Sequence, residues 1–219
     1  MTIENAERLL TLVFRMFVCT VFMLLIIYGV NQWMGNPFEP VGRLFDVNGV
    51  ASIPTWFSSV QLYSIGIVFL CLRAIMGKCQ GSGLFMTLGI GFIYLSLDEA
   101  VVIHETITWP LRHFSWVPRF KGDHGIWILV YGLVGIWLFI AFKNSMLLAS
   151  RNFPRPALIF MSGAGLFILG GVVLEICNYY HLFETLYGLG PILEAGGKMV
   201  GGSFMLLGSG SALVEYCYR

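Results

Sequence analysis

The sequence predicts an all-α fold, a polytopic transmembrane helical bundle with six spans and both termini cytoplasmic. Hydrophobic residues make up 57% of the 219 positions and charged residues only 11%, less than half of the ~25% typical of soluble domains. Six apolar stretches approach or exceed the roughly 20 residues that a helix needs to cross the hydrocarbon of a lipid bilayer. Loops rich in glycine and proline separate these stretches, so we expect residues 1–219 to form a single transmembrane domain.

The spans are expected near residues 9–33, 57–76, 84–109, 125–142, 157–180 and 186–214. The first follows a start that is too acidic for the n-region of a signal peptide, and its apolar run is too long for an h-region, so we expect it to remain as a membrane anchor. Gly77 follows the second span, Pro110 ends the third, and Pro154 precedes the fifth. The connection 181–185 is short, which predicts that the last two spans form an antiparallel hairpin.

The distribution of lysine and arginine predicts the orientation, because positively charged loops stay on the cytoplasmic side. With six spans, one side of the membrane holds Arg8, Arg15, Arg73, Lys78, Lys143, Arg151, Arg155 and Arg219. The opposite side holds Arg43, Arg112, Arg119 and Lys121, and Lys198 lies inside the last span. The side with more positive charge carries both termini, which are therefore expected in the cytoplasm.

Acidic residues and histidines concentrate toward the opposite side. The histidines there are His104, His113, His124 and His181. The end of the third span carries Asp98 and Glu105, and each charge at the bilayer centre costs about 2.5–3.5 kcal/mol on insertion scales, so such residues are functional candidates. With a rise of about 1.5 Å per helical residue, Glu105, Glu175 and Glu194 are expected at one depth, and Asp98 and Lys198 together at a deeper level.

A structural interpretation explains part of this cluster. Asp98 would pair with Lys198, and Glu194 would share a helix face with Lys198 because the two are four residues apart. The remaining acids would leave a surplus of negative charge in a medium of low dielectric constant. Either several of these acids are protonated or a cation lies among them.

A functional interpretation places a transition metal in the cluster. The expected ligands are His104, Glu105, Glu175 and Glu194, with Asp98 close to the site and His181 as a possible cap. Carboxylates combined with imidazole suit iron, copper, manganese or zinc. No haem is expected, because only one histidine lies within a span and no C-x-x-C motif occurs.

Other classes of function are disfavoured. Lys and Arg number 13 against 12 Asp and Glu, so the chain has no basic surplus for nucleic acid. A complete proton relay is also disfavoured, because the acidic cluster ends near the middle of the membrane. The glycines of Gly197-x-x-x-Gly201 and Gly170-Gly171 predict close packing of the last two spans, which would bring Glu175 toward Glu194.

Three segments carry a resemblance to a known group of proteins. They are the string Leu95-Ser96-Leu97-Asp98-Glu99-Ala100-Val101-Val102-Ile103-His104-Glu105, the segment 53–59 (I-P-T-W-F-S-S), and Leu193-Glu194. With these segments the chain resembles a family of uncharacterised bacterial multi-pass membrane proteins, over most of its length. The resemblance implies a helical protein of the bacterial inner membrane and implies no particular reaction.

Two hypotheses about function follow. In the first, the cluster binds a transition metal for redox chemistry or metal handling at the periplasmic side of the inner membrane. In the second, the protein is a non-catalytic accessory subunit that packs against other membrane protein subunits, and the cluster is a structural polar network. The sequence leaves open whether the protein is an enzyme.

Overall fold

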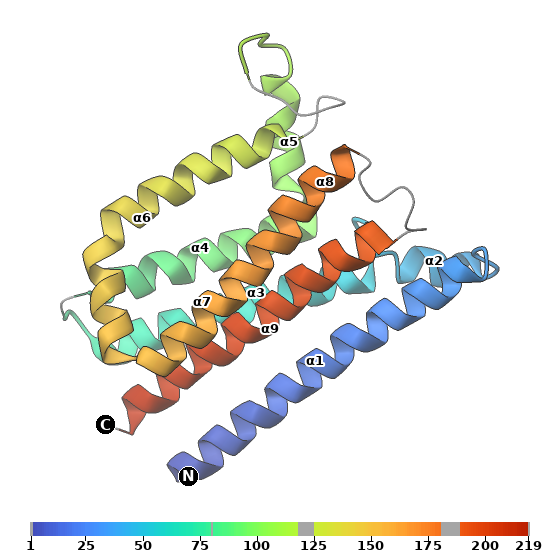
Figure 1. The fold of residues 1–219 in the computed structure, drawn as a ribbon. Coiled ribbons are helices and arrows are strands. Elements are labelled where there is room, and N and C mark those ends of the chain that lie inside the picture. The colour runs from blue at the N-terminus through green and yellow to red at the C-terminus, as the bar shows by residue number, and fades with distance from the viewer. Residues whose placement is uncertain (1, 80, 118–124, 181–188, 219) are drawn as a thin grey trace.

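The structure, a computed structural model, describes residues 2–79, 81–117, 125–180 and 189–218, and within these ranges it is built of helices without strands. Figure 1 shows the helices as an elongated bundle with both chain ends at the same end of the molecule. The elements are α1 (Ile3–Trp33), α2 (Glu39–Leu44), α3 (Ile53–Met76), α4 (Ser82–Val101), α5 (Ile103–Leu111), α6 (Ile126–Asn152), α7 (Pro154–Ile168), the π-helix η2 (Leu169–Leu174), α8 (Glu175–Tyr179) and α9 (Leu189–Cys217).

Capping residues extend two helices beyond the apolar stretches that predicted them. The hydroxyl of Thr2 accepts a hydrogen bond from the backbone N–H of Asn5 at 3.3 Å, and Ser52 caps α3 in the same way through Thr55. A capping hydroxyl satisfies a backbone donor that the first turn leaves unpaired. The two helices therefore begin at Ile3 and Ile53, several residues before the hydrophobic pattern starts.

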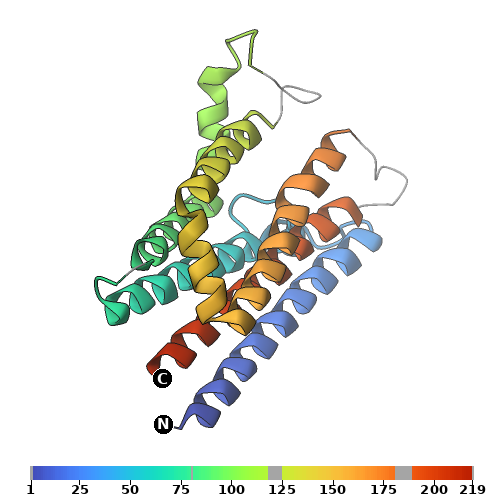
Figure 2. The same ribbon diagram turned by 60° about the vertical axis from the view of Figure 1, so that its left-hand side comes forward.

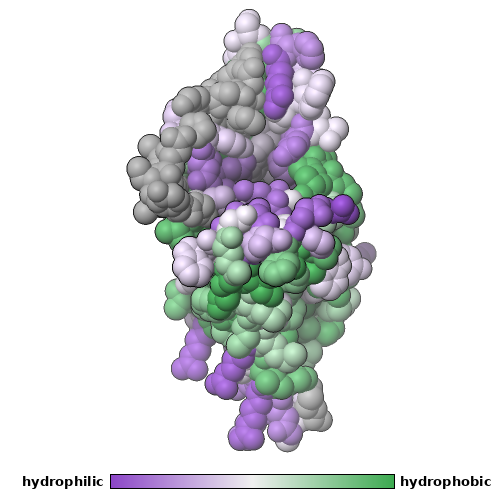
Figure 3. Space-filling view, turned by 90° about the vertical axis from the view of Figure 1, so that its right-hand side faces the viewer, coloured by the Kyte–Doolittle hydropathy of each residue, from purple (hydrophilic) through white to green (hydrophobic). Residues whose placement is uncertain are grey.

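Within the described residues, five helical segments are long and apolar enough to cross a membrane: α1, α3, α4, α6 and the continuous run Pro154–Tyr179. This composition is compatible with a lipid bilayer environment. On the face seen in Figure 3, hydrophobic residues cover the middle of the bundle, and hydrophilic residues project from its lower end and gather again above. The predicted sixth span corresponds to α9, which is not among the five because glycine and serine dilute its apolar residues.

Helix α9 lies inside the bundle, where it contacts α7, α3 and α1 (Figures 1 and 2). Its buried residues include Met199, Ser203 and Met205. Met205 belongs to one hydrophobic core with Phe69 of α3, and Met199 belongs to another with Leu24 of α1. Because neighbouring helices cover α9, this helix does not need the continuous apolar surface that the other five helical segments have.

Glycines allow the backbones of α7 and α9 to touch. A Cβ atom at Gly201 would lie 2.5 Å from the backbone nitrogen of Phe167, and one at Gly163 would lie 2.7 Å from the carbonyl oxygen of Gly201. Farther along, a Cβ at Gly170 would lie 2.7 Å from the carbonyl oxygen of Glu194. Small residues at helix interfaces permit such close approach in membrane proteins. The close packing predicted from these glycines is confirmed.

The third predicted span is not one continuous helix. Val102 has φ 57° and ψ 46°, the left-handed conformation, and separates α4 from α5. A β-branched residue rarely adopts this conformation, so the surrounding contacts must hold it there. The backbone N–H of His104 donates to the Asp98 carboxylate at 2.7 Å, which replaces the helical hydrogen bond that this N–H would otherwise make. The prediction of a single helix over 84–109 was therefore wrong at Val102.

Two further boundaries differ from the sequence prediction. Helix α6 continues to Asn152 rather than ending at Phe142, because the polar residues that follow Phe142 include no helix breaker before Pro154. The fifth span is interrupted by η2, whose π-helical turn begins at Leu169 and includes the glycine pair. π-Helical turns occur often at functional sites, and this one directly precedes Glu175.

Candidate functional site: a polar cluster at one end of the bundle

The cluster lies at the end of the bundle opposite the chain termini, where α4, α5, α8 and the start of α9 meet (Figure 1). Its first unit is Asp98 with His104. The imidazole Nδ1 lies 3.0 and 3.1 Å from the two carboxylate oxygens of Asp98. The side chains are 10% and 21% exposed, respectively. Asp98 thus holds both the backbone and the ring of His104, and it ties the start of α5 to the end of α4.

The second unit is centred on Glu175, the first residue of α8. The indole N–H of Trp127 in α6 donates to its Oε1 at 3.3 Å, and the hydroxyl of Tyr179 donates to the same oxygen. Tyr179 is one helical turn after Glu175, so its side chain lies on the same face. Glu175 therefore joins α8 to α6.

The third unit is centred on Glu194 in α9. Its Oε2 accepts a hydrogen bond of 2.7 Å from the side-chain amide of Asn178, and its Oε1 lies 3.4 Å from Nζ of Lys198. The aliphatic part of Lys198 lies over Gly171, where an added Cβ would be 3.1 Å from Cδ. Glycine at this position of η2 leaves room for the lysine side chain, so Lys198 can pair with Glu194 one turn earlier in α9.

Aromatic rings connect these units laterally. The ring of Trp127 lies 5.1 Å from that of His104 and 5.6 Å from that of Tyr131, measured between centroids. The hydroxyl of Tyr131 lies 2.9 Å from the hydroxyl of Tyr94 in α4. Helix α6 is thereby attached at this end to α4, α5 and α8 through polar aromatic side chains.

The structure assigns different partners to the predicted ion pair. Asp98 bonds to His104, whereas Lys198 lies beside Glu194 and lines a small cavity together with Glu99. The break at Val102 explains the difference, because it folds His104 back toward Asp98. The sequence prediction treated residues 98–105 as part of one unbroken helix, whereas the structure separates α4 from α5 at Val102.

The predicted metal ligands come together only in part. Glu175 lies within electrostatic reach of His104, Glu194 and Lys198, so residues from three helices do gather. Glu105 is exposed on α5. His181, the possible cap, and His124 lie outside the described residues. Within the part of the chain that the structure describes, no three His, Cys, Asp or Glu side chains are arranged to hold a metal ion.

The sequence prediction missed the neutral partners of the cluster, namely Tyr94, Trp127, Tyr131, Asn178 and Tyr179. A signal for some of them was present. Tyr94 precedes Asp98 by four residues, Tyr179 follows Glu175 by four, and Trp127 and Tyr131 are four apart. Residues at this spacing share a helix face. Aromatic residues near a span end are expected at any membrane interface, which hid their role as partners of the acids.

Five apolar helices and a glycine-rich helix inside the bundle define a class of protein, the polytopic helical bundle suited to a lipid bilayer. Residues 13–210 match the model of a family described as a domain of unknown function, DUF8692, and the chain belongs to this family. The match agrees with the expected relation to an uncharacterised family. No curated protein and no solved structure matches the chain.

Proposed function

We propose that the protein is a non-catalytic subunit of a larger membrane protein complex, in which the polar cluster is a structural network. The observation that supports this proposal is the pairing of the acids. Asp98, Glu175 and Glu194 each accept hydrogen bonds from side chains of the same chain. Buried charges are stable when they are paired and hydrogen-bonded, so these contacts account for acids near the membrane without a ligand.

We propose further that α9 is a sixth span, that both termini are cytoplasmic and that the cluster faces the periplasm of a bacterial cell. Arg155 and Glu215 line one cavity near the chain termini, and more positive residues are expected at this end than at the other. A membrane-impermeant maleimide is expected to label a Ser115→Cys variant, with its native cysteines replaced, in intact cells. Cys217, kept alone, is expected to react only after lysis. The reverse pattern would invert the topology.

The surface for a partner is proposed on α6. In this 27-residue helix only Ile126 is buried among the described residues, and bulky apolar side chains such as Trp137 and Phe139 are exposed. A Cβ at Gly132 or Gly135 would meet nothing within 4 Å. These two glycines would let the backbone of another membrane helix approach closely, as small residues do in helix pairs.

The experiment is purification of the full chain from native membranes in a mild detergent. We expect a partner in constant stoichiometry, reduced roughly tenfold in a Gly132→Leu/Gly135→Leu variant because leucine blocks close helix contact. Val134→Leu is the matched control on the same helix and should retain the partner. A monomer without companions would contradict the subunit role. Equal recovery of the partner from both variants would contradict the assignment of its surface to α6.

Metal binding is the second candidate, because Glu175 lies within electrostatic reach of both His104 and Glu194, although these side chains are not arranged as a formed metal site within the described residues. The test passes the same preparation over a chelating resin and measures its metal content by elemental analysis. The metal content of the native chain is compared with that of a Glu175→Gln/Glu194→Gln variant. About one iron, copper, manganese or zinc per chain, lost in the variant, would replace the structural proposal. Such a metal would serve redox chemistry or metal handling at the periplasmic side. Native protein without a bound metal would contradict metal binding and support the interpretation of the cluster as a structural network.

A further inference from the structure

A cavity of about 580 Å³ lies between α1, α7 and α9, close to both chain termini. These three helix ends lie near one another in both ribbon views (Figures 1 and 2). The walls are largely apolar and half-buried, with Leu10, Ile159 and Val214 contributed by α1, α7 and α9 respectively. Ligand sites in proteins commonly have volumes of about 300–1,000 Å³ and walls of this kind.

Charged residues line the same cavity. Arg155 comes from the first turn of α7, Glu7 from α1 and Glu215 from the end of α9. Arg155 and Glu7 are exposed, so the cavity changes from a charged, solvent-facing rim to an apolar wall. Among the described residues neither of these two forms an ion pair, whereas Arg8 on the neighbouring turn pairs with Glu4 at 2.6 Å.

This combination fits one class of ligand. Arginine binds phosphate oxygens through paired N–H donors. Two carboxylates disfavour a headgroup with net negative charge, but they can accept hydrogen bonds from a primary ammonium group. The apolar walls suit a hydrocarbon chain. A phospholipid whose headgroup carries both a phosphate and a primary amine has all three features.

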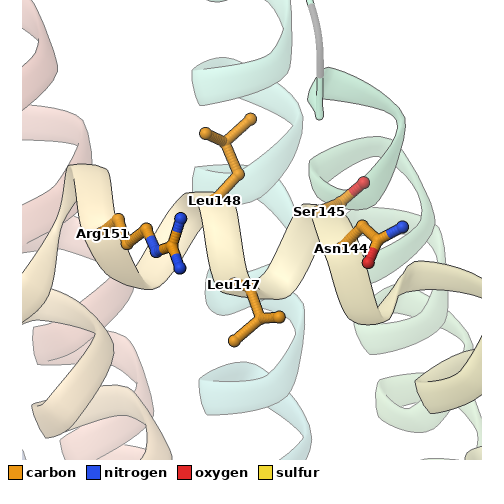
Figure 4. Close-up of a pocket in the computed structure, with 5 residues that line it drawn as sticks. All are labelled: Asn144, Ser145, Leu147, Leu148 and Arg151. Atoms are coloured by element: carbon orange, nitrogen blue, oxygen red, sulfur yellow. The ribbon is translucent and has the colours of Figure 1, made fainter.

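A second hollow near the same end is lined by an arginine and two leucines but by no carboxylate. It measures about 290 Å³, and its lining residues Asn144, Ser145, Leu147, Leu148 and Arg151 all belong to α6. Figure 4 shows that Leu147 and Leu148 point to different sides of the helix. Because the lining comes from one helix, no opposing wall encloses a ligand there.

We propose that the cavity between α1, α7 and α9 binds one phospholipid with a primary-amine headgroup. Arg155 binds the phosphate, and Glu7 with Glu215 accepts hydrogen bonds from the ammonium group. An acyl chain lies along Leu10 and Ile159. The lipid then bridges α1 to the α7–α9 pair at the membrane surface. This assignment requires a membrane location but not the proposed role as a subunit.

The test uses the full chain, delipidated in detergent and titrated with a phosphatidylethanolamine in native mass spectrometry. One lipid is expected to bind in preference to phosphatidylcholine and phosphatidylglycerol of the same chains. Arg155→Gln should weaken this binding roughly tenfold, as expected for loss of a charge-assisted hydrogen bond. Arg8→Gln is the matched control and should bind as the native chain does.

Further measurements separate the alternatives. Ser211→Phe places a ring in the cavity and should abolish the lipid adduct, which keeps the test decisive if Arg155→Gln fails to fold. Equal binding of the three lipids, or equal loss in Arg155→Gln and Arg8→Gln, would overturn the proposal. Displacement of the lipid by millimolar inorganic phosphate would show a free-anion site instead and would overturn the role of the acyl chain.

Discussion

Gly201→Ala is expected to lower the free energy of unfolding by about 3 kcal/mol, the upper end of the usual cost of overpacking. The added methyl group would lie 2.5 Å from the backbone nitrogen of Phe167 and 2.6 Å from the carbonyl oxygen of Gly163. Both neighbours are backbone atoms, so no side-chain rotation can relieve the clash and α7 must separate from α9. Thermal unfolding in detergent, with the yield of monodisperse protein, measures the effect.

The matched control is Gly165→Ala on the facing helix. A Cβ at Gly165 would meet nothing within 4 Å, and alanine favours a helix over glycine by about 1 kcal/mol. This variant should be as stable as the native chain or slightly more stable. Similar behaviour of the two variants would mean that α7 and α9 do not touch at Gly201.

Most of the helical framework could be predicted because the physical cause acts locally. Apolar stretches of membrane length marked the helices, and the spacing of Gly197 and Gly201 marked the contact between α7 and α9. Helix starts such as Ile3 and Ile53 depend on a single capping hydroxyl outside the apolar run. Hydropathy carries no information about such a cap, so these boundaries were missed by several residues.

The candidate site was less predictable, because its contacts depend on one backbone conformation. The sequence marked Asp98, Glu175 and Glu194 as unusual in an apolar chain. Their partners were set by the left-handed residue Val102, which no periodicity indicates. The carboxylate of Asp98 competes with helix continuation at His104, and the outcome of this competition depends on tertiary contacts. The sequence could therefore mark the acids as unusual, but it could not indicate their partners.

Asp98→Ala is expected to lower the free energy of unfolding by roughly 2–4 kcal/mol, because a charged acceptor and a helix cap are lost together. The carboxylate holds the backbone N–H of His104 at 2.7 Å and its ring at 3.0 Å, so alanine leaves both groups without this acceptor. Asp98→Asn keeps one acceptor oxygen and should lower the free energy of unfolding by a smaller amount. Thermal unfolding of both variants, and of each combined with His104→Gln, measures the coupling between the two side chains.

Glu105→Ala is the control that separates the two interpretations of the cluster. Glu105 is exposed on the same short helix, so its loss should change stability by no more than about 0.5 kcal/mol, as at other surface positions. If the cluster is a structural network, Asp98→Ala must lower the free energy of unfolding much more than Glu105→Ala does. The effects of substituting Asp98 and His104 must also be coupled. A larger loss from Glu105→Ala would mean that Glu105 contributes to a metal-dependent structure. In that case the acids of α5, α8 and α9 would act together as ligands rather than as separate hydrogen-bonded pairs.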